Sequence, residues 1–292
     1  QSMIYGNEPE LTYSYSNVAG TEIPGFSGAL SISGTDAGQQ TITLGTLALK
    51  DNGDFKASNY SLELNSTPVS FEIGKASGKI AIPENQTVTY DGEIVTAGLF
   101  TGDVKYLYEG DGETLVKWYA DNNGECGEAL SEAPYNVGEY WVGVSATDGT
   151  NYNATTEVVK KFTISPLNIS DDTVTIETIP DQIYSGEAIE PVIEIAHSGS
   201  KLVMDTDYTV SYEDNTVTGT GIVTITGIGN FIGNATANFT INKTNANIMV
   251  DTASYTKTFG DDDFNLGITD SNPETDVVYS SSDEDVVTVS GD

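Results

Sequence analysis

The sequence has no arginine, and its 11 basic residues face 44 aspartates and glutamates, which gives a formal net charge of −33 over 292 residues. Surfaces that bind phosphate need clustered Lys or Arg, so this balance argues against nucleic acid and anionic membranes as partners. No apolar run approaches the roughly 18 residues of a membrane helix, so we expect no membrane insertion. A chain of this length has room for about two to four domains.

Cysteine and histidine are equally scarce. The single Cys126 excludes an internal disulfide, and the acidic residues near it would raise the pKa of its thiol, which disfavours a nucleophile. The single His197 lies in the segment Ala-His-Ser-Gly-Ser, from which we expect an exposed loop histidine. Without a base beside a nucleophile, the chain is not expected to be an enzyme.

Two short motifs recur along the chain. An Asn-aromatic pair followed by a closing Phe-x-Ile occurs at 58–73, 150–164 and 229–241. An aromatic residue followed closely by Gly opens each unit, at Tyr5, Tyr90, Tyr184 and Phe259. Repetition at about 75 to 95 residues indicates tandem domains, because solenoid repeats are shorter.

Within a unit the apolar pattern has a period of two. Tyr140, Val142 and Val144 alternate with Trp141 and Gly143, and other stretches rich in Val, Ile and Thr alternate in the same way. Such stretches, broken by Gly, Asn and Asp, indicate β-strands, and no run has helical spacing with caps. The sequence therefore predicts an all-β chain of tandem antiparallel β-sandwiches in an elongated array.

The same residues carry a resemblance to known families. The first unit, with IYGNEPELTYSYS and DAGQQTITLGTL, resembles bacterial MBG domains of the YGX type, and the second, with VTYDG, VKWY and KKFTI, resembles their YDG-type relatives. The third, with IPDQIYSGEAIEP and DTDYTVSYEDNTVTGTGIVTITGIGNFIGNA, resembles immunoglobulin-like repeats in surface proteins of gut Firmicutes. The last, with VVYSSSDEDVVTVSGD, is similar to part of a group 2 bacterial immunoglobulin-like domain. The resemblance implies extracellular stalks and adhesin shafts with no activity of their own.

These observations give four units, 1–75, 76–165, 166–244 and 245–292. The resemblance favours a stalk or spacer of a cell-surface or secreted protein of a Gram-positive gut bacterium, whose partners are other modules of the same protein. Accessory modules of a secreted enzyme are a further alternative, ranked behind the binding of a glycan or host protein. No cofactor is expected.

Alternation also assigns the side chains to faces. Phe-x-Ile places both side chains in one core, and the ring of the Asn-aromatic pair is expected to plug one end of that core. Trp118 shares a face with Val116 and is expected to be buried, as is Tyr140. The predicted core residues are Phe71, Ile73, Trp118, Tyr140, Phe162, Ile164, Phe239 and Ile241.

Three alternatives remain open. Trp141 and Tyr119 point outward and could stack on a sugar ring, so the second unit is a candidate for binding a glycan or a host surface protein. The acids Asp261, Asp262, Asp263, Asp283 and Asp285 could supply oxygens to calcium, against a background of solvated loop acids. A Lys–Asn isopeptide bond, known in some bacterial surface sandwiches, has no identifiable motif here.

The two ends of the chain give a further expectation. Residues 1–3 look like a tag remnant and are left out of the predicted fold, so the first unit lacks a strand ahead of Tyr5. The fourth unit has no Phe-x-Ile closer. We therefore expect an open sheet edge in residues 3–75 and poor packing, or completion by another chain, in residues 245–292.

Overall fold

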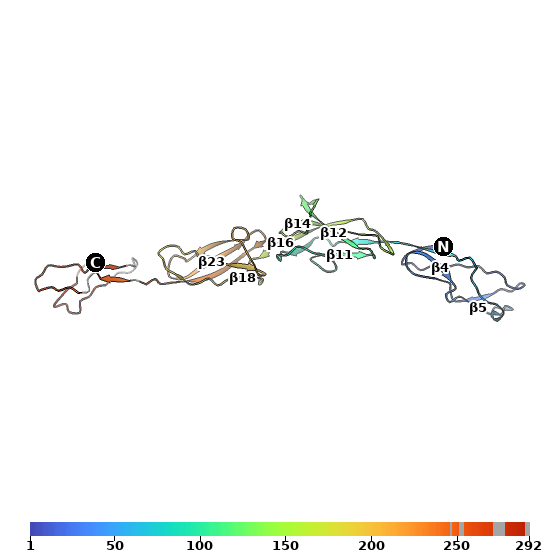
Figure 1. The fold of residues 1–292 in the computed structure, drawn as a ribbon, viewed down its shortest axis with the longest axis horizontal. Coiled ribbons are helices and arrows are strands. Elements are labelled where there is room, and N and C mark those ends of the chain that lie inside the picture. The colour runs from blue at the N-terminus through green and yellow to red at the C-terminus, as the bar shows by residue number, and fades with distance from the viewer. Residues whose placement is uncertain (246, 251–253, 271–277, 290–292) are drawn as a thin grey trace. The chain divides into compact units, whose positions relative to one another are not determined.

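The computed structural model describes residues 1–245, 247–250, 254–270 and 278–289. Regular structure in these ranges is almost entirely β-strand, and the one helical element among them is a 3₁₀ turn, η1 (Ala57–Asn59). The predicted all-β fold class is confirmed (Figure 1). None of the described residues forms a helix long and apolar enough to cross a membrane.

The chain divides into two compact units, Gln1–Leu167 with Gly229–Phe231, and Asn168–Ile228 with Ile232–Asp292. Each described sheet lies within one of the four ranges drawn from the sequence. We call these ranges module one (1–75), module two (76–165), module three (166–244) and module four (245–292).

Module one contains one larger sheet and one strand pair. Its strands are β1 (Ser2–Ile4), β2 (Gly25–Ser27), β3 (Ser31–Ile32), β4 (Gly38–Thr43), β5 (Ala48–Lys50) and β6 (Ser70–Gly74). The larger sheet has the order β1-β6-β4-β3, and β2 pairs with β5. Because β1 contains Ser2 and Met3 and pairs in parallel with β6, the expectation that no strand precedes Tyr5 was wrong.

Module two has the largest sheet. Its strands are β7 (Ala76–Ser77), β8 (Lys79–Ala81), β9 (Gln86–Thr89), β10 (Ala97–Leu99), β11 (Val104–Glu109), β12 (Thr114–Asn122), β13 (Glu125–Ala129), β14 (Gly138–Ala146), β15 (Tyr152–Asn153) and β16 (Val158–Ser165). A five-stranded sheet, β13-β12-β14-β16-β9, accompanies a three-stranded sheet, β10-β11-β8, and a β15-β7 pair. Figure 1 labels β11, β12, β14 and β16 in the green part of the chain.

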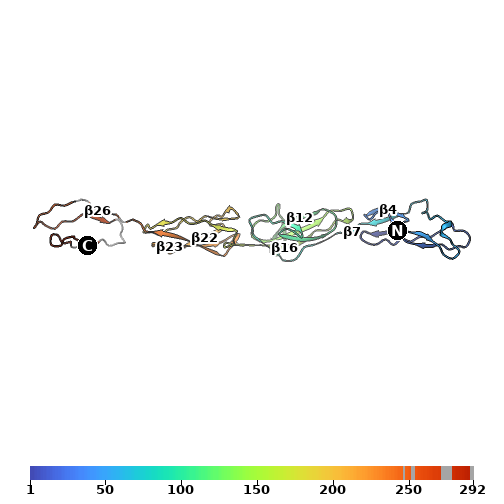
Figure 2. The same cartoon turned by 90° about the horizontal axis from the view of Figure 1, so that it is seen from below.

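Module three repeats this plan. Its strands are β17 (Leu167–Asn168), β18 (Val174–Ile176), β19 (Gln182–Ile183), β20 (Ile195–His197), β21 (Ser200–Lys201), β22 (Tyr208–Glu213), β23 (Gly219–Gly227), β24 (Phe231–Ile232) and β25 (Asn234–Asn242). The sheets are β19-β25-β23-β22 and β18-β20-β21, with a β17-β24 pair. Figure 2 shows β22 beside β23.

One sheet topology is common to the three modules. The strand ahead of the opening aromatic residue pairs in parallel with the closing strand. The closing strand in turn pairs antiparallel with the strand two places earlier in the chain, which is β4, β14 or β23. In register, the closing Ile always faces a glycine: Ile73 faces Gly38, Ile164 faces Gly138 and Ile241 faces Gly219.

The closing Phe-x-Ile residues lie in the cores. Phe71, Ile73, Phe162 and Ile164 are each 1% exposed, Phe239 is 3% exposed and Ile241 is 2% exposed. Residues two apart on a strand share a face, so one closing strand supplies two large apolar side chains to its own module. Burial of each stabilises the module by about 1.5–3 kcal/mol relative to exposure.

Two of the predicted core residues of module two lie at the edge of its core. Trp118 is half-buried with its ring edge-on to Phe162 at 5.5 Å, so the prediction that it is buried was wrong. Tyr140 is also half-buried, and its hydroxyl donates to the backbone oxygen of Asn136 at 2.9 Å. A side chain as large as Trp is rarely covered completely in a small sandwich.

Module four differs from the other three. Its described strands are β26 (Ile248–Val250), labelled in Figure 2, and β27 (Ile268–Asp270), and the two pair antiparallel. Among the residues after 245 whose burial the structure describes, none is buried, and Phe259 is fully exposed. The described part of module four is therefore poorly packed.

Candidate functional site

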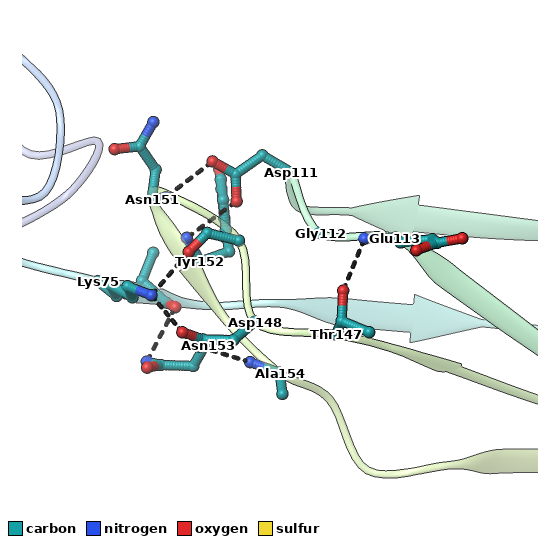
Figure 3. Close-up of polar contacts among 12 residues, drawn as sticks. Lys75, Asp111, Gly112, Glu113, Thr147, Asp148, Asn151, Tyr152, Asn153 and Ala154 are labelled. Carbon is teal, nitrogen blue, oxygen red and sulfur yellow. Dashed lines mark hydrogen bonds and ion pairs between the residues drawn. The ribbon is translucent and has the colours of Figure 1, made fainter.

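The Asn-aromatic motif of module two, Asn151 and Tyr152, lies where the turn after β14 leads into β15. The Asp111 carboxylate, from the loop between β11 and β12, accepts the backbone N–H of Asn151 at 2.7 Å and that of Tyr152 at 3.1 Å (Figure 3). A Cβ atom added to Gly149 would lie 2.0 Å from an Asp111 oxygen, so this close approach requires glycine. The turn therefore presents the Asn151 side chain in a fixed orientation.

That side chain binds module one. Its Oδ1 accepts the backbone N–H of Ala37 at 2.7 Å, and its Nδ2 donates to Oδ1 of Asp36 at 3.1 Å. The backbone oxygen of Asn151 accepts the N–H of Ala76 at 2.9 Å, at the start of module two. One asparagine thus joins both sides of the junction, through hydrogen bonds that are each worth about 0.5–1.5 kcal/mol.

The neighbouring ring completes the contact. Tyr152 and Tyr5 lie with ring centroids 5.5 Å apart and planes at 71°, the edge-to-face arrangement that aromatic quadrupoles favour. Tyr5 is the opening aromatic residue of module one. We expected the ring of the Asn-aromatic pair to plug the core of its own module, whereas this ring contacts the preceding module.

Polar contacts also fix the chain that links the two modules. The Lys75 ammonium forms an ion pair with Asp148 and donates to the backbone oxygen of Gly149 at 2.6 Å (Figure 3). Asn153 donates its side-chain N–H to the backbone oxygen of Ala76 at 3.2 Å. The hydrogen bond from Lys75 lowers the pKa of Asp148 below its ordinary value, so this carboxylate stays charged at neutral pH.

The next copy of the motif, Asn230 and Phe231, makes the same set of hydrogen bonds. Asn230 Oδ1 accepts the backbone N–H of Val137 at 2.9 Å, and its Nδ2 donates to Oδ1 of Asn136 at 3.0 Å. Its backbone oxygen accepts the N–H of Leu167 at 3.0 Å. All five residues belong to the first compact unit.

The aromatic contact is repeated as well. Phe231 lies edge-on to Tyr90, with centroids 5.5 Å apart and planes at 78°, and only 3% of Phe231 is exposed. Tyr90 is the opening aromatic residue of module two. We call this set the junction motif: an Asn-aromatic pair, the opening aromatic residue of the preceding module, and the two residues that its Asn side chain binds.

Sequence reasoning did not find the receiving half of the junction motif. The residues that bind the Asn side chain, Asp36 with Ala37 and Asn136 with Val137, directly precede Gly38 and Gly138, the glycines that face the closing Ile. This shared position is the signal that could have identified them.

The first copy of the Asn-aromatic pair behaves differently. The Tyr60 ring stacks on Phe55 of its own module at 4.8 Å, and its hydroxyl donates to Glu22 at 2.9 Å. The side chain of Asn59 makes no hydrogen bond with any described residue and is exposed. In module one the pair is therefore an internal packing element.

The candidate glycan residues lie on neighbouring strands, because Tyr119 and Trp141 are directly opposite each other in register. Both are half-buried rather than fully exposed. The Trp141 indole N–H donates to Asp121 at 2.9 Å, and the Tyr119 hydroxyl donates to Glu157 at 2.8 Å. Desolvation and the nearby Glu157 raise the pKa of Tyr119 to about 12. The polar atoms of both rings are thus engaged within module two.

The candidate calcium ligands are exposed loop acids. Two of them make local turn contacts: Asp261 accepts the N–H of Thr258 at 2.9 Å, and Asp283 accepts that of Asp285 at 3.1 Å. Asp262 and Asp263 are likewise exposed. Among the described parts of the chain, no group of three or more His, Cys, Asp and Glu side chains gathers in a way that could hold a metal.

The single histidine and the single cysteine of the chain both lie in strands. His197 is 5% exposed at the end of β20, so the expectation of an exposed loop histidine was wrong. The turn begins one residue later, at Ser198 and Gly199, which both have positive φ, and His197 shares the inner face with Ile195. Cys126 is exposed on β13, where desolvation and the charge of Glu157 raise the pKa of its thiol.

The chain matches no protein-family model, and no curated protein matches it significantly.

Proposed function

We propose that this chain is a non-catalytic stalk of a bacterial cell-surface or secreted protein, and that it holds other modules away from the cell wall. The observation that carries the proposal is the junction motif, which occurs twice with the same hydrogen bonds and the same edge-to-face ring pair. Residues that recur at junctions between modules, rather than around a pocket, serve to connect.

The contacts at each junction suit a spacer that has to resist bending. Each junction ties the linking chain, an Asn side chain and two rings together, so bending there would break several contacts at once. A free linker with few contacts across it would leave relative domain motion as the default. The junction motif therefore stiffens the chain at the points where a string of domains is weakest.

Charge and sequence resemblance support the same function. A net charge of −33 keeps neighbouring copies apart on a crowded surface through mutual repulsion. The resemblance to MBG and bacterial immunoglobulin-like domains supports an extracellular location. The glycan-binding alternative has less support, because the polar atoms of Trp141 and Tyr119 already bond within module two.

Small-angle X-ray scattering of the chain tests the proposal. Strands of about ten residues give modules of roughly 35 Å, so the stalk should have a maximum dimension on the order of 120 Å. A single compact globule of this length would have a radius of gyration of about 19 Å, and finding that value would overturn the proposal.

A pair of variants tests the role of the junction motif in the same experiment. Asn151→Ala combined with Asn230→Ala removes both side-chain bridges and should broaden the distribution of distances. Asn59→Ala removes the equivalent side chain of module one, which bridges nothing in the described structure, and should leave the scattering unchanged. Equal scattering from all three proteins would show that the junction motif does not set the stiffness.

A further inference from the structure

Modules two and three each hold the first and last strands of their main sheet side by side. β9 pairs with β16 and β19 pairs with β25, and we call these two the parallel pairs. In each module the chain enters ahead of the first of these strands and leaves after the second. Tension on the two ends of a module therefore pulls the paired strands past each other along their length. Because hydrogen bonds between parallel strands are evenly spaced, they carry this load together and must break together.

The two parallel pairs differ in length. In module two, Gln86–Thr89 pair with Phe162–Ser165. In module three, Gln182–Ile183 pair with Ile241–Asn242. Each pair is extended by one hydrogen bond, in which the N–H of the opening aromatic residue donates to the backbone oxygen of the residue after the closing Ile at 2.9 Å. The parallel pair of module two has more hydrogen bonds to break together, so it should resist the larger force.

Neighbouring contacts do not offset this difference. A side-chain hydrogen bond reinforces each parallel pair: the Ser165 hydroxyl donates to the backbone oxygen of Val88 at 3.0 Å, and Asn242 Nδ2 donates to Asp181 at 3.2 Å. In the second sheets, β8 and β18 are strands of three residues, and each pairs antiparallel with its neighbour, β11 or β20. The length of the parallel pair is therefore the main difference between the two load paths.

We propose that the chain bears tension in a graded way, so that module three unfolds before module two when the chain is pulled at its ends. Unfolding of module three releases roughly 250 Å of chain while module two stays folded. The stalk then lengthens under load, which lowers the force on whatever it holds. The use of this property rests on the proposed stalk function, whereas the order of unfolding follows from the two parallel pairs alone.

Single-molecule pulling of the full chain from its two ends tests the order. Full extension should release roughly 290 Å from module two and roughly 250 Å from module three, since an extended residue spans up to about 3.6 Å. Module one is close to module three in length, so about forty Gly-Ser residues are inserted after Gly53, in an exposed turn, to move its step to roughly 380 Å. The step of module three should precede that of module two. The reverse order, or no fixed order, would overturn the proposal.

Two proline variants test whether the parallel pair sets the resistance of module two. The N–H of Tyr90 donates to the closing strand, and the N–H of Val88, two residues earlier on the same strand, points the same way. Val88→Pro removes this donor and should raise the unfolding rate of module two at constant force about tenfold or more. Thr87→Pro is the matched control, because its N–H points away from β16 at the edge of the sheet, where proline is tolerated.

Equal changes in both variants, or no change in either, would overturn the proposal, because the parallel pair would then not set the resistance of module two. If Val88→Pro does not fold, the order of steps in the chain that carries only the insertion after Gly53 still decides. The scattering experiment is independent of this one. A compact globule there overturns the stalk, whereas a reversed order of steps overturns only the grading of the load.

Discussion

Modules one and two each contain one sheet of the same topology, and they differ in their second sheet. Both pair a strand ahead of the opening aromatic residue with a closing Phe-x-Ile strand, in the same order and the same directions. Module two also has a three-stranded sheet, β10-β11-β8, whereas module one has the strand pair β2-β5. The repeated motifs therefore go with the first sheet, which the two modules have in common, and they do not specify the second.

The cores reflect this difference. In module two, Val104, Tyr106, Val142 and Val144 are at most 6% exposed and come from both sheets. In module one, the buried cluster around the closing strand consists of Ile42, Phe71 and Ile73, with half-buried residues packed on it. Burial of apolar area is the main stabilising term, so module two should be the more stable of the two.

The largest expected effect comes from truncating the closing Phe. Phe162→Ala and Phe71→Ala should each destabilise their own module by about 3–5 kcal/mol, because each leaves a cavity in a packed core. Denaturant unfolding followed by hydrogen exchange in each module measures the loss. Phe100→Ala removes a ring that is 66% exposed and serves as the control. If either core truncation melts every module together, the modules are not independent.

The junction should show the next largest effect. Asn151→Ala leaves the Ala37 N–H without its acceptor and should weaken the coupling between modules one and two by about 1–3 kcal/mol. The coupling is measured as the loss of module one stability in the full chain. Asn59→Ala is the matched control within the same motif. Equal losses from both variants would contradict the contrast drawn between the two copies.

The paired rings should contribute less. A double-mutant cycle of Tyr5→Leu and Tyr152→Leu should give a coupling energy of about 0.5–1.5 kcal/mol, the usual range for an edge-to-face pair. Thermal unfolding of the four proteins supplies the values. Additive single effects would mean that the two rings touch without mutual stabilisation.

The smallest effect is expected from Lys75→Met. Its partner Asp148 is exposed, so salt should screen the ion pair. The difference in free energy of unfolding between the variant and the unsubstituted protein should therefore disappear at high ionic strength. The pKa of Asp148 is lowered from its ordinary value of 3.8, so the contribution is present above that value and is lost as pH falls through the lowered pKa. Unfolding at neutral and acidic pH, with and without salt, checks both trends. If the variant is still less stable at acidic pH and high salt, the loss comes from the packing of the Lys75 methylene groups instead.

Much of the fold could be predicted from local pattern. Alternation in a segment such as 140–144 depends only on the two-residue period of a strand, so the all-β class and the inward direction of Phe162 follow directly. His197 was misplaced because a Ser-Gly turn and the strand end before it share one short segment, and only pairing with β18 shows where the strand stops. Trp118 was misplaced because a face assignment does not reveal how far the opposite layer covers it.

The sequence by itself determined that an Asn-aromatic pair recurs, since repetition is visible without coordinates. Only the tertiary structure decided what each copy does, because its partners lie far away in sequence: Asn151 meets Asp36 and Tyr152 meets Tyr5. The first copy of the pair, Asn59 and Tyr60, has a different role, because the Tyr60 ring packs on Phe55 inside its own module. A side chain's role depends on which atoms stand opposite it, and that is fixed by the packing of whole modules rather than by neighbours along the chain.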